Sequence, residues 1–401
     1  MSTRRLYYDD SFMREFDAHV LACEAEMRDN KPAWGIVLDA TAMYPTSGGQ
    51  PCDLGKLGSA NVIEVRDVGD DIVHIVDACV DKGPVHGCID WPRRFDHMQQ
   101  HTGQHLLSAM FQERFGRPTV SFHLGDDICT IDLRGPEPGP EILEGAERAA
   151  NQIIADDRPI NVRYGTAEQF AELGVRKEVQ RTGILRAIEI EGADLQPCGG
   201  THLARTAQIG ILLVRECSKI RQDWRVEFVC GRRVVQLARH EAHALQQASE
   251  RLGCAPSDLA ASVDRITKER DAHFKGLKSA LQRLAQADAA SAVKLVSSDS
   301  SLRIIAQAFD EETQPEYLNY FATELAKVSG TIALLGRTSC GHLIFAQHPS
   351  VGRDLNALLK QVFSEFPGKG GGTKDFVRGR LNDPAQAAKA VERAKALLLT
   401  S

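Results

Sequence analysis

Two pairs of candidate metal ligands stand out in the sequence, each pair separated by three residues. His101 and His105 lie in DHMQQHTGQHLLSAMFQERFG, residues 96–116, and Cys198 and His202 lie in LQPCGGTHLART. Side chains four positions apart on a helix lie one above the other, so two imidazoles can reach one ion. Three imidazoles and a thiolate form a mixed nitrogen and sulfur set, which favours zinc over calcium or magnesium. Each pair alone is a weak signal, but together they predict a zinc site.

The elements that hold these residues are also indicated by the sequence. A helix is predicted over 96–115, with Asp96 as its N-cap and Gly116 as its stop, because aspartate accepts from free amides and glycine adopts the left-handed conformation of helix ends. Around the second pair, the glycines at 199 and 200 indicate a tight turn rather than a helix. Such a turn lets the thiolate and the imidazole converge.

The chemistry of this zinc site is not fixed by the ligands. A metalloprotease of the His-Glu-x-x-His type needs a glutamate after its first histidine, and Thr102 occupies that position. Four protein ligands describe a closed structural site, whereas catalytic zinc keeps one position open. The catalytic group is unassigned, with His101 and Cys198 as candidates. Gln100 and Gln104 are interpreted either as supports of the ligands or as helix surface.

The bulk composition is that of a soluble globular protein. The chain has 401 residues, 43% hydrophobic and 25% charged, and at roughly 100 to 200 residues per domain it should contain two to four domains. No apolar run approaches the roughly 20 residues that span a bilayer, and the start lacks a signal-peptide core, so we expect a cytoplasmic protein without a membrane partner. Ten scattered cysteines suit a reducing compartment. A net charge of −6 argues against a wholly basic nucleic-acid binder, but allows a local basic surface.

The pattern of short β-rich runs and helices predicts a multidomain α+β protein in four parts. These are an N-terminal small antiparallel β-barrel (or sandwich) over 1–95, an α+β zinc-binding domain over 96–233, a helical spacer over 234–290 and a C-terminal α/β domain over 291–401.

The spacer contains a long apolar seam with three-four spacing. The segment GCAPSD, residues 253–258, divides it into two helices. The seam follows the second helix through Leu259, Val263, Ile266, Arg270, Phe274, Leu277, Leu281 and Leu284. This spacing predicts a two-helix hairpin or a short coiled coil, and an amphipathic helix packed on a domain fits equally well. The 257–290 helix is therefore also a candidate contact for a homodimer.

A glycine-rich and basic segment, FPGKGGGTKDFVRGRL at 366–381, is predicted to be a loop. It is not a P-loop, which requires Gly-Lys-Ser/Thr after four intervening residues. Its backbone amides are exposed by Gly368, Gly370, Gly371 and Gly372, and its cations are Lys369, Lys374, Arg378 and Arg380. That combination suits phosphate contacts on a folded RNA, although a solvated flexible loop fits the sequence equally well.

Three stretches of the chain resemble one known family. MQQHTGQHLLS followed by CGGTHLART is similar to the split zinc motif of the editing domain of alanyl-tRNA synthetase and its freestanding relatives. LDATAMYPTSGGQPCDLG, residues 38–55, resembles the glycine-rich stretch of that family, and GKGGGTKDF resembles its C-terminal domain. A similar domain occurs in DHH-type phosphoesterases, but the chain contains no Asp-His-His. The resemblance runs from about residue 30 to the end and leaves no room for an aminoacylation domain, as in a long-form AlaX-type trans-editing protein.

The resemblance implies a function and a set of roles. The activity would be ATP-independent hydrolysis of the ester in tRNA(Ala) mischarged with serine, with Gly-tRNA(Ala) as a second candidate substrate, and the C-terminal domain would bind tRNA. The zinc ligands would be His101, His105, Cys198 and His202. The pocket would contain Thr41, Ser47, Gly48, Gly49 and Gln50, with Thr41 or Gln50 as the partner of the serine hydroxyl that alanine lacks.

Two alternatives stay open beside this interpretation. The stretch PTSGGQP can be read as a simple turn, since proline, serine and glycine cluster in turns. The whole chain can also be an RNA-binding or interaction protein with a structural zinc and no hydrolase activity. Loss of activity on metal removal with the fold retained would favour the enzyme.

Overall fold

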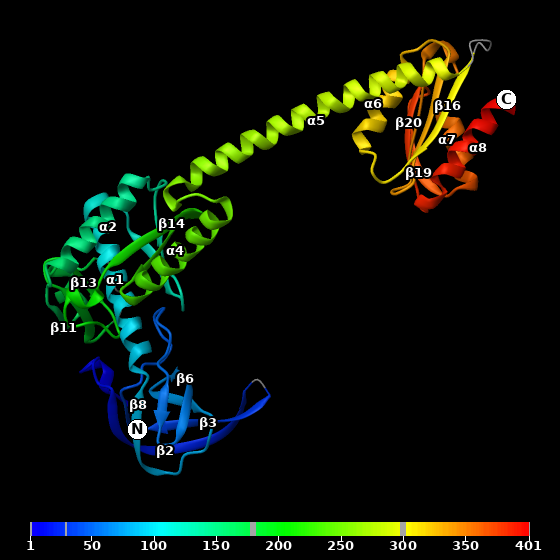
Figure 1. Ribbon diagram of the computed structural model, residues 1–401. Helices are drawn as coiled ribbons and strands as arrows, with labels where there is room; N and C mark the ends of the chain where they lie inside the picture. The colour runs from blue at the N-terminus through cyan, green and yellow to red at the C-terminus, as the bar shows by residue number, and fades with distance from the viewer. Residues whose placement is uncertain (1, 29, 177–181, 297–301, 401) are drawn as a thin grey trace. The chain divides into compact units, whose positions relative to one another are not determined.

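The computed structural model describes residues 2–28, 30–176, 182–296 and 302–400. Helices and strands are mixed throughout, which confirms the predicted α+β class (Figure 1). The chain forms two compact units, Met1–Gln247 and Ala248–Ser401. The predicted spacer therefore starts in the first unit, and the division into four parts stays a prediction. Within the described ranges, no helix combines the length and apolar character needed to cross a membrane.

Six strands near the N-terminus form a closed barrel in the order β2-β3-β7-β6-β5-β8. Their bounds are β2 (Glu15–Arg28), β3 (Lys31–Leu38), β5 (Gly55–Leu57), β6 (Ala60–Val68), β7 (Asp71–Val76) and β8 (Gly83–Ile89). The first half of β2 alternates exposed and buried side chains, as a strand with one face in a core must. The alanines and glutamates of β2 favour helices, so pairing with β3 and β8, rather than local propensity, makes this segment a strand. Beside the barrel, β1 (Arg4–Arg5) pairs with β4 (Ala40–Thr41), and a 3₁₀ turn covers Leu6–Tyr8.

Helix α1 (Trp91–Phe115) carries the first ligand pair and begins five residues earlier than predicted. Its N-cap is Asp90, whose side chain accepts from a backbone amide of a first turn that also contains proline. The predicted cap, Asp96, instead forms an ion pair with Arg233 at 2.6 Å. The predicted end is confirmed, since Gly116 adopts a left-handed conformation with φ of 63°.

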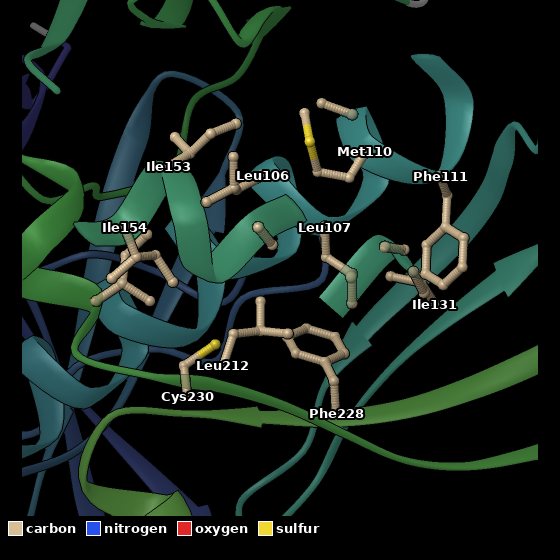
Figure 2. Packing of buried hydrophobic residues seen from close by; sticks show 14 of the residues in the cluster. Leu106, Leu107, Met110, Phe111, Ile131, Ile153, Ile154, Leu212, Phe228 and Cys230 are labelled. Atoms are coloured by element: carbon tan, nitrogen blue, oxygen red, sulfur yellow. The ribbon is translucent and has the colours of Figure 1, made fainter. Parts of the chain in front are cut away.

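Two small sheets and three further helices complete the first unit. The sheets have the orders β14-β15-β10-β9 and β11-β12-β13. The bounds are β9 (Thr119–Leu124), β10 (Cys129–Leu133), α2 (Pro140–Ala155), β11 (Ile160–Gly165), α3 (Ala167–Glu172), β12 (Leu185–Ile190), β13 (Asp194–Pro197), a 3₁₀ turn (Thr206–Ile209), β14 (Leu212–Ile220), β15 (Asp223–Cys230) and α4 (Arg232–Leu252). Figure 2 shows how α1, α2 and the larger sheet share one core, in which Leu106, Leu107, Phe111, Ile131 and Phe228 are fully buried.

The second unit is a five-stranded sheet with helices on both faces, in the order β16-β17-β18-β20-β19. Among the described strands of this sheet, β16 and β17 run parallel and the other neighbours run antiparallel. The bounds are a 3₁₀ turn (Pro256–Asp258), α5 (Leu259–Leu295), β16 (Arg303–Phe309), α6 (Pro315–Ala326), β17 (Thr331–Arg337), β18 (His342–Gln347), a 3₁₀ turn (Pro349–Val351), α7 (Leu355–Glu365), β19 (Gly368–Gly372), β20 (Phe376–Leu381), a 3₁₀ turn (Pro384–Gln386) and α8 (Ala387–Thr400). α5 and α6 pack on one face of the sheet, and α7 and α8 pack on the other.

The glycine-rich segment is not the predicted loop: it forms two paired strands, with β19 at the edge of the sheet and β20 beside it. β19 pairs with β20 along its whole length, so that Gly370 lies opposite Gly379. A Cβ atom at Gly370 would lie 2.4 Å from the Cα atom of Gly379 and 2.3 Å from a carbonyl oxygen. Only glycine allows the two strands to approach so closely here. A glycine-rich composition is also typical of flexible loops, so the sequence alone did not reveal this role in strand pairing.

The apolar seam of α5 is largely exposed in the single chain. Its side chains Val263, Ile266, Phe274, Leu277 and Leu284 are 39–66% exposed. The C-terminal part of the helix packs on α6, where Ala285 and Ala289 are buried. This end of α5 behaves as an amphipathic helix packed on a domain, whereas its exposed seam is free to meet another surface.

Candidate metal centre

The four predicted metal ligands come together in the first unit. The donor atoms of His101, His105, Cys198 and His202 all lie within 4.8 Å of one another. The Cys198 sulfur lies 3.5 Å from Nε2 of His101 and 3.3 Å from Nε2 of His202. The two histidines of α1 thus meet the cysteine and histidine that follow β13, and the cluster can hold a metal ion.

The ring of His101 is oriented from the barrel side by Gln50. The Gln50 side-chain oxygen accepts a hydrogen bond from the backbone amide of Thr201 and lies 2.8 Å from Nδ1 of His101. Since that oxygen is an acceptor, Nδ1 must donate the proton, and Nε2 is left with its lone pair directed at the cluster. Gly200 makes room for this ring, because a Cβ atom there would lie 2.2 Å from Cε1 of His101.

The other two imidazoles have partners of the same kind. Nδ1 of His105 lies 3.1 Å from the Asp194 carboxylate, which also accepts a hydrogen bond of 2.8 Å from Arg176. Nδ1 of His202 lies 3.2 Å from the hydroxyl of Thr102. All three histidines therefore turn Nε2 toward Cys198 and hold Nδ1 in hydrogen bonds, as metal-ligating histidines almost always do.

The electrostatics of the cluster favour an ionised thiol. Burial alone would raise the pKa of Cys198, but electrostatic interactions with His101 and His202, together with hydrogen bonds to the imidazoles, outweigh burial and hold that pKa well below its usual range. Burial, assisted by charge on His101, lowers the pKa of His202 to about 3. Burial also opposes the charged form of His105, yet hydrogen bonds with Asp194 and Cys198 raise its pKa to about 9. A thiolate facing imidazoles is the donor set that a soft or borderline metal requires.

A cavity of about 560 Å³ opens directly onto the cluster. Its wall includes the ligands His101, His105 and Cys198. The other polar or aromatic side chains of the wall are Arg5, Tyr7, Tyr8, Tyr44, Ser47, Asp67, Gln104, Thr119, Ser121, Phe122, Arg176 and Gln196. This volume lies within the usual range of small-molecule sites.

The predicted pocket residues divide into two groups. Ser47 and Gly48 line the cavity. Thr41, Gly49 and Gln50 are not part of its wall. Thr41 is fully buried and its hydroxyl lies 2.8 Å from Nε2 of His74. A Cβ atom at Gly49 would lie 3.0 Å from the ring of Phe122, which lines the cavity, so Gly49 acts by allowing this approach.

The two glutamines that flank the ligands on α1 have different surroundings. Gln100 is fully buried, and its side chain bonds the backbone amide and carbonyl of Cys230. Gln104 is 3% exposed, lines the cavity and donates a 2.9 Å hydrogen bond to Ser108. Among the described residues, no group donates to the side-chain oxygen of Gln104.

Asp194, Arg176 and Tyr8 were not predicted from the sequence. Asp194 holds a ligand histidine, and both Arg176 and Tyr8 line the cavity. The available signal was weak: Asp194 lies four positions before Cys198, and a carboxylate near a ligand set is a common partner of histidine.

Comparison with known proteins shows which families this chain resembles. Residues 185–226 match the family described as "Threonyl and Alanyl tRNA synthetase second additional domain". The alanyl-tRNA editing protein AlaX-L of Pyrococcus horikoshii is 29% identical over 396 residues, which cover 94% of this chain and 94% of that protein. The chain is similar to an alanyl-tRNA editing protein over nearly its whole length.

Further relatives are similar to this chain over smaller shares of their own length. The alanyl-tRNA editing protein Aarsd1 of Danio rerio is 31% identical over 65% of this chain and 66% of its own length. The alanine–tRNA ligase of Pyrococcus abyssi is 30% identical over 99% of this chain, but the match covers only 44% of the ligase. The chain thus spans less than half of the ligases that it resembles, and nearly all of the freestanding archaeal editing protein.

Proposed function

We propose that this chain is a zinc-containing aminoacyl-tRNA deacylase that hydrolyses Ser-tRNA(Ala) in trans, with Gly-tRNA(Ala) as a second candidate substrate. The observation that carries the proposal is that His101, His105 and Cys198 line one cavity. A purely structural metal gains nothing from such exposure to a cavity, whereas a metal that acts on a substrate needs it. Editing proteins of similar length, named for alanyl-tRNA, support the substrate class.

The donor set fits zinc. Tetrahedral zinc with bonds of about 2.1 Å to nitrogen and 2.3 Å to sulfur gives an edge of about 3.6 Å between the two donors. The distances from the Cys198 sulfur to His101 and His202 are 3.5 and 3.3 Å. Bound zinc would supply positive charge that orients and polarises the ester of the substrate. His101 and Cys198, the candidates for a catalytic group, would then serve as ligands, because their donor atoms converge with those of His105 and His202.

Gln104 is the group in the wall best placed to recognise the serine hydroxyl. The side chains of Thr41 and Gln50 are occupied by His74 and by the metal cluster. In contrast, the Gln104 oxygen is buried and accepts no hydrogen bond within the described chain. Seryl esters would satisfy it and alanyl esters would not, and a site of this type can reject the smaller analogue by up to roughly 10⁴-fold.

The deacylase proposal is tested by comparing hydrolysis of Ser-tRNA(Ala) and Ala-tRNA(Ala), without ATP, by the wild-type chain and by Cys198→Ala. We expect rapid cleavage of the seryl ester alone, lost in the variant, while circular dichroism shows that the fold is kept. Binding of tRNA without cleavage of either ester would refute the deacylase and leave an RNA-binding protein with a structural zinc. Zinc content measured on both proteins links activity to the ion.

The selectivity proposal is tested in the same assay with Gln104→Met, which keeps the length of the side chain and removes its acceptor. Ser-tRNA(Ala) hydrolysis should fall at least tenfold, and the slow cleavage of Ala-tRNA(Ala) should not fall. An equal fall for both esters would show that Gln104 is not the hydroxyl partner. Thr41→Val is the companion variant, because the Thr41 hydroxyl is buried and lies behind the cavity wall.

We also propose that the tRNA is held by the basic residues of the second unit and that α5 mediates a homodimer. Lys369, Arg378 and Arg380 lie on β19 and β20, and Lys374 lies between the two strands. For the dimer, the exposed seam of α5 supplies an apolar surface at coiled-coil spacing. In sedimentation experiments the wild-type chain should have the mass of a dimer and Phe274→Glu the mass of a monomer. If the two proteins have the same mass, whether that of one chain or of two, this role of α5 is refuted.

A further inference from the structure

Four cationic or titratable side chains form a continuous row across the second unit's sheet. Arg337 of β17 lies opposite His342 of β18, His342 lies opposite Arg380 of β20, and Arg380 lies opposite Lys369 of β19. Residues directly opposite in antiparallel strands point to the same face of a sheet and approach closely. The register alone therefore places all four side chains side by side on one face.

That face is only partly covered by helices. Ile344 and Ala346 of β18 share the face of His342 and pack in the core beneath α6. Next to α6, a cavity of about 360 Å³ lies over β18, β20 and β19. Its wall contains Arg337, His342, Lys369 and Arg380. The wall also contains Arg378, two positions before Arg380 on β20, and Pro315, Leu318 and Asn319 of α6. No carboxylate stands among the described residues of this wall.

The positive charge of the row is not neutralised within the described part of the chain. The ion pairs found there include none made by Arg337, Lys369, Arg378 or Arg380. Arg337 is instead held by the sulfur of Cys340 and the backbone carbonyl of Glu311, and its Nε atom is buried without a partner. By contrast, the nearby Arg393 is paired with Glu365 at 2.7 Å.

Such a row costs stability unless an anion joins it. Like charges directly opposite on a sheet repel, and this repulsion is visible at His342, where burial and the charges of Arg380 and Arg337 lower the pKa. A phosphate group brings up to two negative charges and several acceptor oxygens, and arginine binds it with two parallel hydrogen bonds.

We propose that the row Arg337–His342–Arg380–Lys369 is a binding site for a phosphate ester. The ester can belong to the backbone of a folded RNA or to a free nucleotide, and both present the same anionic oxygens. The RNA source rests on the proposed tRNA function, whereas the nucleotide source is independent of it. Two of the four residues, Arg337 and His342, lie outside the glycine-rich segment, so the site is built by the fold of the whole sheet.

The test compares a double variant of the row with a matched control in the full-length chain. Lys369→Gln/Arg380→Gln removes two exposed cations of the row, and Lys360→Gln/Lys389→Gln removes two exposed cations from α7 and α8. Binding of tRNA(Ala) transcript is measured at several salt concentrations. We expect the row variant to bind at least about tenfold more weakly than the control and its salt slope to fall by about 1.5, at roughly 0.7 to 0.9 per phosphate contact.

A second titration, with inorganic phosphate and with adenosine monophosphate, separates the two sources. Loss of nucleotide and phosphate binding in the row variant, with tRNA binding unchanged, supports the free nucleotide. Loss of tRNA binding supports the RNA backbone. If the row variant matches the control for all three ligands, the proposal is overturned. Cys198→Ala distinguishes this result from failure of the deacylase, because that variant should lose hydrolysis and keep both binding activities.

Discussion

The sharpest test of the metal centre is a single methyl group at Gly200. A Cβ atom at this position would lie 2.2 Å from Cε1 and 2.5 Å from Nδ1 of His101, and 3.0 Å from the side-chain oxygen of Gln50. Ordinary contact requires about 3.4 Å or more, so the His101 ring must move by about 1 Å in Gly200→Ala. Metal-ligand distances tolerate only about 0.2 Å, and His101 must therefore lose its place in the ligand set.

The neighbouring glycine is the matched control. A Cβ atom at Gly199 would lie 3.4 Å from the hydroxyl of Tyr8, an ordinary contact. Overpacking by one methyl costs typically about 1–3 kcal/mol, which predicts zinc affinity weakened by roughly 5- to 150-fold in Gly200→Ala and nearly unchanged in Gly199→Ala. Competition with a chromophoric chelator measures the affinity, and deacylation of Ser-tRNA(Ala) should fall in parallel. Equal zinc affinities for the two variants would show that the His101 ring is not confined as described.

Three further predictions concern buried polar groups. Asp194→Asn should weaken zinc binding by about 10- to 100-fold in the same competition, whereas Asp132→Asn, equally exposed at 8% and also paired with arginine, should leave it unchanged. Burial lowers the pKa of His74 to about 4, below the value of about 6.5 in an unfolded chain. Because the unfolded state then binds the proton more tightly, stability should fall by about 3 kcal/mol as the pH drops from 6.5 to 4, and urea unfolding of His74→Gln should show a smaller fall. Arg94 and Asp53 form a fully buried ion pair, so Arg94→Met should cost about 3–5 kcal/mol in urea unfolding, and adding Asp53→Asn should restore part of it.

The four residues of the cluster could be predicted from the sequence because their spacing expresses local geometry. His101 and His105 share a helix face, and Cys198 and His202 flank a turn, so each pair is visible within a few residues. The partners of their Nδ1 atoms were not predictable in this way. Gln50 lies 51 positions before His101, and its role depends on how the barrel packs against α1.

The limits of helix and strand prediction have equally specific causes. The predicted end of α1 was correct because Gly116 acts locally, but the start was wrong because the acceptor at Asp96 is taken by Arg233, 137 positions away. The glycine-rich segment was assigned to a loop because composition reports flexibility, while pairing of Gly370 with Gly379 decides the structure.

The barrel and the metal centre form one functional piece, although the sequence suggested two domains. Gln50 from the barrel side bonds both His101 and Thr201, and therefore links α1 to the segment of the second ligand pair. Asp53 lies nearby in sequence and neutralises Arg94, one turn from the start of α1. A chain that begins at residue 96 would lack both supports and the cavity wall around Ser47. The smallest fragment that can form the described cluster must therefore include the barrel, and the motif of His101, His105, Cys198 and His202 alone is not sufficient.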